Sequence, residues 1–213
     1  MPVISNYKIE TDSHVVVWRM GEEDAILKKE LSVSNEEEKE LSEFSPKRQI
    51  EWIMARYLIK QFTGKKYEKD THGKPHLIGC DLHISISHSR DLLAVAVSKN
   101  YIGIDIQYQT ERLKKMAWRV LNEEKLRQLD NTNELLHLHI YWGAKEAMYK
   151  AHGKRDLHFK NNILIKPFSK IPTEIGLQFV TTGSVIKNTF QKNFQIYFNC
   201  LDEYVLVIAT EKE

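Results

Sequence analysis

Residues 142–150 read Trp-Gly-Ala-Lys-Glu-Ala-Met-Tyr-Lys, a stretch with the periodicity of a helix. Helical spacing puts Trp142, Glu146 and Lys150 on one face, because each lies four residues after the previous one. The same spacing occurs in an earlier helical segment, at Trp52, Arg56 and Lys60. The two stretches indicate that the chain contains two related helices.

Two apolar segments repeat each other in the same order as these helices. Residues 92–97 read Leu-Leu-Ala-Val-Ala-Val, and residues 204–209 read Tyr-Val-Leu-Val-Ile-Ala. Each run is typical of a buried strand. The double repeat predicts an α+β fold of two similar halves, residues 1–104 and 105–213, with a cleft between them.

Composition limits the possible classes of function. Of the 213 residues, 42% are hydrophobic and 28% are charged, which is an ordinary globular balance. A net charge of +2 does not indicate a nucleic-acid partner, and no apolar run approaches the ~20 residues of a membrane span. The start lacks the pattern of a secretory signal, and two distant cysteines, Cys80 and Cys200, do not suggest a disulfide scaffold. We therefore expect a cytoplasmic protein without membrane or nucleic-acid contacts.

A carboxylate interrupts an apolar strand at residues 103–107, Gly-Ile-Asp-Ile-Gln. Burial of Asp105 is costly unless the group is paired or binds a metal. Period-two alternation puts Asp105 and Gln107 on one face of the strand. The segment alone supports two interpretations equally: an Asp that caps a turn at the strand end, or a functional carboxylate.

The acid and the base on the helix at 142–150 also have two interpretations. An ordinary Glu–Lys pair on a helix surface contributes only ~0.3–0.5 kcal/mol. Trp142 indicates that this face is partly buried, and a half-buried carboxylate and ammonium suit Mg²⁺ and a phosphate respectively. Glu146 and Lys150 are thus candidates for a metal and phosphate site.

A third cluster combines a turn with a strand end. Lys74 lies in a Gly-Lys-Pro turn, where Pro75 restricts the backbone and makes the ammonium a positioned charge for phosphate. Ser87 and His88, in an Ile-Ser-His-Ser segment, can donate hydrogen bonds to an anionic oxygen. For a lone histidine in a turn, a solvated or capping role is the simpler interpretation.

Together, four motifs resemble the surfactin-type 4'-phosphopantetheinyl transferases: Gly-Lys-Pro, Ile-Ser-His-Ser, Gly-Ile-Asp-Ile and Trp-x-x-Lys-Glu-x-x-x-Lys, in this order. The resemblance runs from about Ser45 to Gly153 and continues as pattern alone through the C-terminal strands. Any one motif is weak, whereas all four in order are specific. The family folds as a pseudo-dimer of two similar α+β halves and binds coenzyme A between them, which agrees with the internal repeat.

The resemblance implies a role for each matched residue. Asp105 and Glu146 would bind Mg²⁺, and Lys150 would contact the pyrophosphate or help to activate the attacking serine. The 3'-phosphoadenosine end of coenzyme A would be held by residues of the N-terminal half: Lys74, Pro75, Ser87 and His88. Residues 44–76 contain eight basic and three acidic residues, and two of the bases are candidates for further phosphate contacts: Arg48 and Arg56.

The implied reaction moves the 4'-phosphopantetheine arm of coenzyme A to a serine of an acyl, peptidyl or aryl carrier protein and releases 3',5'-ADP. Catalysis would rest on Mg²⁺ and lysine charge around the pyrophosphate, with Glu146 as the leading base for the serine proton. A monomer is expected, because one chain contains both halves. Lys114, Lys115 and Arg119 could form a basic patch that attracts an acidic carrier, or simply a solvated helix face.

One departure from the family concerns Gln107, where relatives often have Glu. Gln is neutral and offers one carbonyl oxygen, so the expected metal ligands are Asp105, Glu146 and, as a weaker third, Gln107. We expect activity with weaker or more selective metal binding, and comparison with Gln107→Glu tests this.

The alternative is a non-catalytic relative that binds coenzyme A or a carrier protein. A kinase or nucleotidyl transferase is not indicated, because the sequence lacks the glycine-rich phosphate loops.

Overall fold

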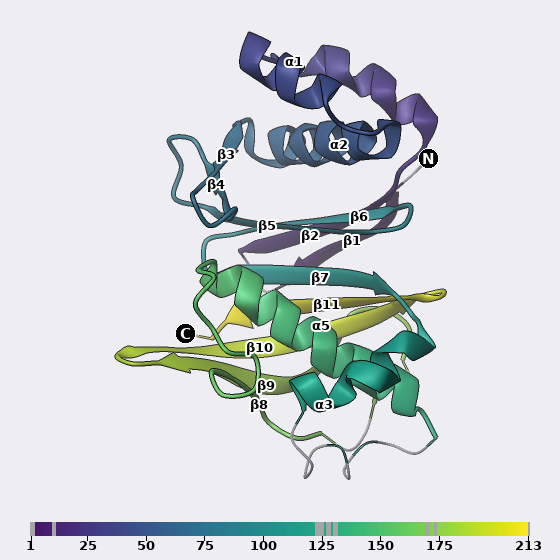
Figure 1. The fold of residues 1–213 in the computed structure, drawn as a ribbon, viewed down its shortest axis with the longest axis vertical. Coiled ribbons are helices and arrows are strands. Elements are labelled where there is room, and N and C mark those ends of the chain that lie inside the picture. The colour runs from purple at the N-terminus through teal and green to yellow at the C-terminus, as the bar shows by residue number, and fades with distance from the viewer. Residues whose placement is uncertain are drawn as a thin grey trace.

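In the part of the chain that the structure describes, two antiparallel sheets each pack against one long helix (Figure 1). The computed structural model describes residues 3–9, 12–121, 126, 129, 132–168, 171–172 and 174–212. Within these residues the fold is α+β with two similar halves, as the sequence predicts.

The N-terminal half carries six strands, in the order β1-β2-β6-β5-β4-β3. Its elements are β1 (Val3–Ile9), β2 (Ser13–Arg19), the 3₁₀ helix η1 (Glu22–Glu30), α1 (Asn35–Ser42), α2 (Pro46–Thr63), β3 (Tyr67–Lys69), β4 (Pro75–Leu77), β5 (His83–Ser89) and β6 (Leu92–Ser98). The side chain of Ser45 caps α2, Pro46 occupies its first turn, and Gly64 ends it in the left-handed conformation.

The C-terminal half carries five strands, in the order β7-β11-β10-β9-β8. Its elements are β7 (Ile102–Tyr108), the 3₁₀ helix η2 (Glu111–Met116), α3 (Ala117–Val120), α5 (Glu134–His152), β8 (Ile163–Ile165), β9 (Gln178–Lys187), β10 (Phe190–Leu201) and β11 (Tyr204–Glu211). Because β7 pairs with β11 along its whole length, the chain changes sheets between Ser98 and Ile102. Residues 102–104, which the expected boundary assigns to the first half, therefore lie in the second sheet.

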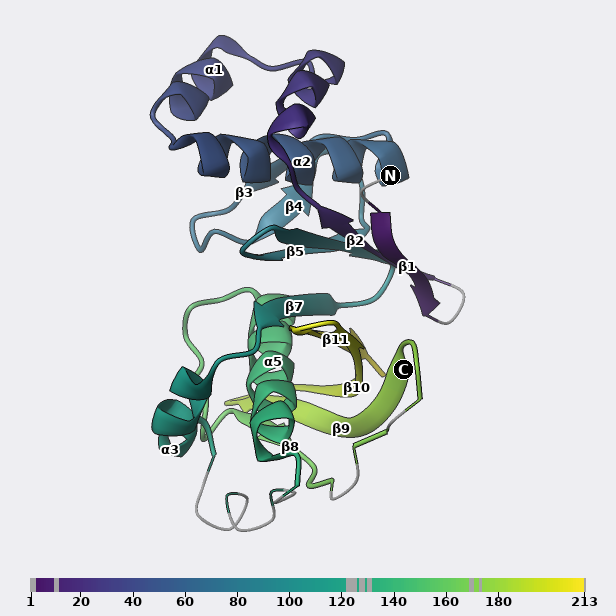
Figure 2. The ribbon, with the colours of Figure 1, turned by 90° about the vertical axis from the view of Figure 1, so that its right-hand side faces the viewer.

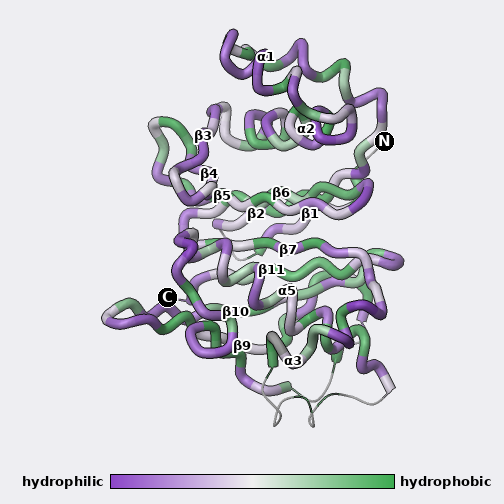
Figure 3. The backbone as a smooth tube through the Cα atoms, in the orientation of Figure 1, coloured by the Kyte–Doolittle hydropathy of each residue, from purple (hydrophilic) through white to green (hydrophobic). Residues whose placement is uncertain are grey.

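Figure 2 shows α2 on the side of the N-terminal sheet that faces away from β7, and α5 alongside the strands of the C-terminal sheet. Helix α2 covers the outer face of the N-terminal sheet, and α5 covers the outer face of the C-terminal sheet, while the inner faces pack on each other. In β6, Leu93 and Val95 contact the α2 side, whereas Leu92 and Ala94 contact the second sheet. A strand buried on both faces needs apolar residues throughout, which explains the unbroken runs at 92–97 and 204–209. Figure 3 shows the apolar residues concentrated along these central strands.

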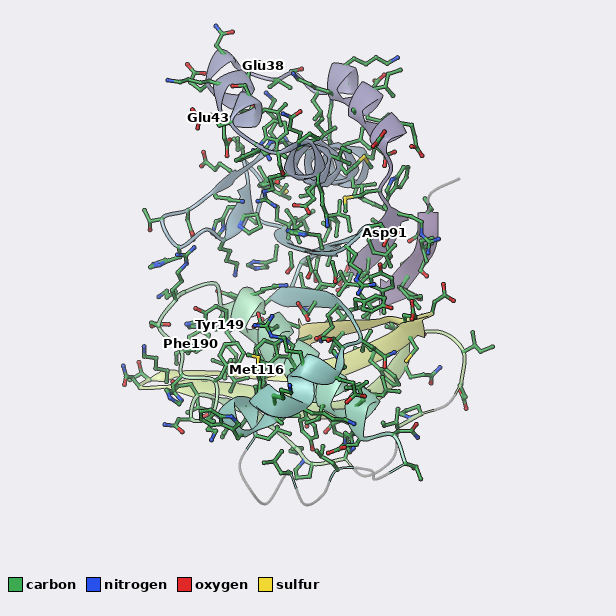
Figure 4. All side chains as sticks on the ribbon, turned by 45° about the vertical axis from the view of Figure 1, so that its right-hand side comes forward. Glu38, Glu43, Asp91, Met116, Tyr149 and Phe190 are labelled. Atoms are coloured by element: carbon green, nitrogen blue, oxygen red, sulfur yellow. The ribbon has the colours of Figure 1, made fainter. Side chains whose placement is uncertain are left out.

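A glycine lets α5 lie directly on β7. A Cβ atom on Gly103 would stand 1.7 Å from the carbonyl oxygen of Ala147 in α5, so any larger residue must displace the helix. On the helix side, a Cβ on Gly143 would stand 2.6 Å from a methyl carbon of Val207. Side chains fill the remaining space between the layers (Figure 4). The two glycines bring the backbone of α5 close to the strand that carries Asp105.

The segment between β7 and α5 begins with the 3₁₀ helix η2, followed by the single turn α3, and residues 122–125, 127–128 and 130–131 lie outside the described part. The predicted strand at 204–209 is part of the longer β11. Among the described residues, no helix combines the length and the apolar character required to cross a bilayer.

Candidate active site between β7 and α5

Asp105 and Lys150 form the centre of the candidate site. Asp105 lies on β7 and is 7% exposed, and Lys150 lies in the last turns of α5. The Nζ atom of Lys150 stands 2.9 Å from Oδ1 of Asp105 and also donates to the carbonyl oxygen of Ile104 at 3.0 Å. The ammonium therefore fixes one carboxylate oxygen of Asp105.

Glu146 lies one helical turn before Lys150 and is half-buried. Burial raises the pKa of its carboxyl group, the negative charge of Asp105 raises it further, and the positive charge of Lys150 opposes both effects. Two carboxylates and one ammonium thus share a small volume, as the sequence motifs predict for Asp105, Glu146 and Lys150. A carboxylate with a raised pKa is suited to accept a proton.

The second oxygen of Asp105 supports a metal site. Oδ2 is buried and has no hydrogen-bond partner in the part of the chain that the structure describes. A buried carboxylate oxygen without a partner is costly, and a hard cation such as Mg²⁺ would satisfy it. The described residues contain no cluster of three or more His, Cys, Asp or Glu residues placed to hold a metal. The donor set therefore fits a site with two protein carboxylates, Asp105 and Glu146.

Gln107, the third expected ligand, is engaged elsewhere. Its Nε2 donates to the carbonyl oxygen of His139 at 3.0 Å, and its Oε1 lies 2.9 Å from Nδ1 of the same residue. The backbone N–H of Thr110 donates to Nε2 of His139, so Nδ1 carries the proton that the amide oxygen of Gln107 accepts. Burial lowers the pKa of His139, which keeps this ring neutral. The contact with His139 occupies one of the two lone pairs of Oε1, so Gln107 is at most a weak third ligand.

A pocket of about 580 Å³ lies beside this centre in the N-terminal half. Its lining combines several bases with apolar and aromatic side chains: Arg48, Glu51, Trp52, Ala55, Arg56, Tyr67, Lys69, Gly73, Pro75, Ile86, His88 and Leu93. The pocket contains Arg48, Arg56, Pro75 and His88, four of the six residues expected to bind coenzyme A. Lys69 was missed as a site residue, although it belongs to the basic stretch at 44–76.

Three side chains on one wall of this pocket fix one another. One Nη atom of Arg48 lies 2.8 Å from the Glu51 carboxylate and 3.2 Å from Nε2 of His88. Because a guanidinium only donates, Nε2 of His88 accepts, and Nδ1 donates to Glu51 at 3.2 Å. Burial lowers the pKa of His88, and the charge of Arg48 adds to this, while Glu51 opposes it. Arg48 and His88 therefore present one charged and one neutral group to the pocket.

Arg56 differs from Arg48 in its surroundings. Its guanidinium carbon lies 3.5 Å from the centre of the Trp52 ring, and it donates to Glu37 at 3.3 Å and to the hydroxyl of Tyr67 at 3.1 Å. These contacts tie α2 to α1 and β3. Arg48 thus has the more accessible charge, whereas the guanidinium of Arg56 is held by side chains that pack α1 and β3 on α2.

A second pocket adjoins the first and reaches Lys150. It is lined by residues of both halves: His72, Gly73, Lys74, Pro75, Ile84, Ser85, Ile86, Tyr149, Lys150, Gly153 and Arg155. The Nζ atom of Lys74 donates to the carbonyl oxygen of Ala151 at 2.5 Å, at the negative end of α5. Lys74 therefore links the Gly-Lys-Pro turn to the helix that carries Glu146. The sequence analysis did not predict two of these lining residues, Tyr149 and Arg155, although Tyr149 precedes Lys150 and Arg155 lies two residues after Gly153.

Comparison with known proteins agrees with this geometry. Residues 101–209, from β7 to β11, match the sequence profile of the 4'-phosphopantetheinyl transferase superfamily. The chain belongs to this superfamily. It is also 29% identical over 111 residues to the 4'-phosphopantetheinyl transferase gsp of Aneurinibacillus migulanus, a match that covers 49% of this chain and 46% of that protein. The match thus spans slightly less than half the length of this curated relative.

The matched region contains the carboxylates and the lysine of the candidate centre. Asp105, Glu146 and Lys150 of this superfamily member lie within residues 101–209, whereas Lys74, Ser87 and His88 lie before them.

Ser87 was expected at the 3'-phosphoadenosine end of coenzyme A, but its hydroxyl lies against Asp105 and Lys150.

The predicted basic patch is only partly described. Lys114 forms ion pairs with Glu111 at 3.0 Å and with Glu134 at 3.5 Å, so its charge is largely balanced. Lys115 is exposed, and the side chain of Arg119 lies outside the described part. The patch remains a prediction.

Proposed function

We propose that this superfamily member transfers the 4'-phosphopantetheine arm of coenzyme A to a serine of a carrier protein. The observation that carries the proposal is the pairing of Asp105 with Lys150, while the buried Oδ2 atom of Asp105, near Glu146, has no partner among the residues that the structure describes. A non-catalytic fold would gain nothing from such an arrangement, because an unsatisfied buried carboxylate oxygen is destabilising.

Each of these residues has a separate part in the proposed reaction. The serine oxygen of the carrier bonds to the β-phosphorus of coenzyme A, and the bond from that phosphorus to the bridging oxygen breaks, so that 3',5'-ADP leaves with the electron pair. Glu146 takes the serine proton, since its pKa is raised towards the value of an effective base. The ammonium of Lys150 lies where it can offset the negative charge of the pyrophosphate.

Mg²⁺ held by Asp105 and Glu146 would neutralise charge on the phosphate oxygens during transfer. Lys150 keeps Oδ1 of Asp105 occupied, and within the described part of the chain Oδ2 is the oxygen left for the ion. Gln107 is not a ligand in this proposal, and its two hydrogen bonds to His139 hold α5 against β7.

The two adjoining pockets would hold coenzyme A. Gly73, Pro75 and Ile86 line both of them, which makes them neighbouring parts of one groove. The guanidinium of Arg48, beside His88, stands at one end of this groove and suits a phosphate, and Lys150 stands at the other end, next to the two carboxylates. The groove thus has phosphate-binding groups at both ends, as the 3'-phosphate and the pyrophosphate of coenzyme A require.

The alternative is a non-catalytic relative that binds coenzyme A or a carrier, and the engagement of Gln107 by His139 favours it. The two functions are distinguished by incubating the protein with coenzyme A, Mg²⁺ and a panel of apo acyl, peptidyl and aryl carriers and then measuring intact carrier mass. We expect at least one carrier to gain the mass of 4'-phosphopantetheine. A protein that binds coenzyme A but modifies none of the carriers would be the non-catalytic relative.

A further inference from the structure

Three serines alternate along β5 and point towards the second sheet. Each hydroxyl oxygen accepts a hydrogen bond from a backbone N–H of β7, at 3.0 to 3.1 Å. The pairs are Ser85 with Ile104, Ser87 with Ile106, and Ser89 with Tyr108. We call these three residues the serine row.

The serine row covers the open edge of the C-terminal sheet. β7 is the edge strand of that sheet, so its outward N–H groups have no neighbouring strand to accept from them. Buried N–H groups need an acceptor, and the row supplies one for every second residue of β7. Its shared function is therefore structural, because it joins β5 of one half to β7 of the other.

Ser87 has contacts that the other two members lack. Besides the N–H of Ile106, its oxygen accepts from the ammonium of Lys150 at 2.9 Å. The same oxygen lies 3.3 Å from Oδ1 of Asp105. A hydroxyl has two lone pairs and one hydrogen, so with both lone pairs occupied the hydrogen is left for the carboxylate.

We infer that Ser87 is a positioning residue of the metal site, which holds Asp105 so that Oδ2 is the oxygen presented to the cation. This inference rests on the proposed function. Ser87 and Lys150 together occupy Oδ1, and Oδ2 is the buried oxygen without a partner in the described chain. Groups that orient a metal ligand through a hydrogen bond commonly change metal affinity when removed. Ser87 itself, with all three hydrogen-bonding positions used, has none left for coenzyme A.

The test compares Ser87→Ala with Ser89→Ala. Both variants lose one hydrogen bond to a β7 N–H, but only the first loses the contacts to Asp105 and Lys150. Mn²⁺, as a probe for Mg²⁺, is titrated into each full-length protein saturated with coenzyme A, and the free ion is followed by its paramagnetic resonance signal. We expect Ser87→Ala to bind Mn²⁺ about tenfold more weakly than wild type, and Ser89→Ala to match wild type. Thermal melts of both variants show how much each lost bond affects folding.

A second titration separates positioning from a direct contact. Coenzyme A binding is measured by calorimetry in EDTA, where we expect Ser87→Ala and wild type to have the same affinity. If Ser87→Ala binds coenzyme A several-fold more weakly in EDTA, Ser87 is a coenzyme A contact and the inference is overturned. Equal Mn²⁺ affinities for Ser87→Ala and Ser89→Ala would also overturn it while leaving the proposed function intact. The proposed function itself would fail if wild type bound coenzyme A but neither Mn²⁺ nor any carrier.

Discussion

At the scale of single residues, the two arginines of the basic helix have different roles. Arg48 has an accessible guanidinium next to His88, whereas Arg56 is stacked on Trp52 and bonded to Glu37 and Tyr67. The sequence could not distinguish them, because both lie in the same basic stretch and neither has a gap-free match to a motif. The difference arises from the packing of α1 and β3 on α2.

We therefore expect different effects on coenzyme A binding from the two alanine variants. Arg48→Ala should weaken coenzyme A binding by about tenfold, as expected for one lost charge-assisted contact, and it should also lower stability because the buried carboxylate of Glu51 loses its ion pair. Arg56→Ala should lower the free energy of unfolding by about 2 kcal/mol, because it removes a cation–π contact and two hydrogen bonds. Calorimetric titration and urea denaturation measure the two quantities. The reverse pattern would make Arg56 the coenzyme A contact.

The raised pKa of Glu146 predicts the pH dependence of transfer. Burial and Asp105 raise this pKa above the ordinary value of 4.5. A base works only when deprotonated, so activity should be lost as the pH falls through the raised pKa and retained above it. The kcat/KM profile, measured at limiting Mg²⁺ from about pH 5 to about pH 8, should show this acidic limb, and saturating Mg²⁺ should move the limb to lower pH, because a cation bound by Glu146 lowers its pKa. A profile without an acidic limb in a protein that stays folded would argue against Glu146 as the base.

At the scale of elements, the contact between β7 and α5 positions the candidate site. Gly103 lies two residues before Asp105, and Ala147 follows Glu146, so the closest approach of strand and helix lies next to the two carboxylates. The spacing that keeps the carboxylates together thus depends on a residue without a side chain.

Gly103→Ala should disturb both stability and transfer. The new methyl group would meet the carbonyl oxygen of Ala147, and overpacking of this kind costs about 1–3 kcal/mol. The helix must move, so Glu146 and Lys150 shift relative to Asp105, and we expect transfer to fall more than stability alone explains. Urea denaturation and a transfer assay well below the unfolding midpoint measure the two effects. If Gly103→Ala had the stability and the transfer activity of wild type, the close approach of α5 to β7 would not be required.

The central elements could be predicted from the sequence, because their burial leaves a clear pattern. α2 has a serine cap, a proline in its first turn and a terminal glycine, and β6 and β11 are apolar throughout because both of their faces are covered. The 3₁₀ helices were harder to predict, since four of the six residues at 111–116 are charged and the apolar pattern is short. β1 has mostly exposed residues, so it leaves no apolar run to recognise.

At the scale of the whole molecule, the candidate site exists only where the two halves meet. Asp105 and Lys150 come from the second half, and Ser87 contacts both of them from the first half, where Lys74 also donates to the carbonyl oxygen of Ala151 in α5. The motifs placed Asp105, Glu146 and Lys150 in one site, because their residue types carry the chemistry. They could not reveal that Ser87 faces Asp105, since an alternating serine strand looks like a solvent-exposed face. The bond between Gln107 and His139 was equally hidden, because it depends on how α5 lies along β7.

If Asp105 and Glu146 together support Mg²⁺-dependent transfer, replacing either carboxylate should abolish the response of transfer to Mg²⁺. Transfer to a responsive carrier is measured by intact mass against Mg²⁺ concentration, for wild type, Asp105→Asn and Glu146→Gln. We predict that wild type is inactive in EDTA and saturates with Mg²⁺, and that both variants stay folded, bind coenzyme A and show at least about a hundredfold less transfer at any Mg²⁺ concentration. Near-wild-type transfer by either folded variant would contradict the account.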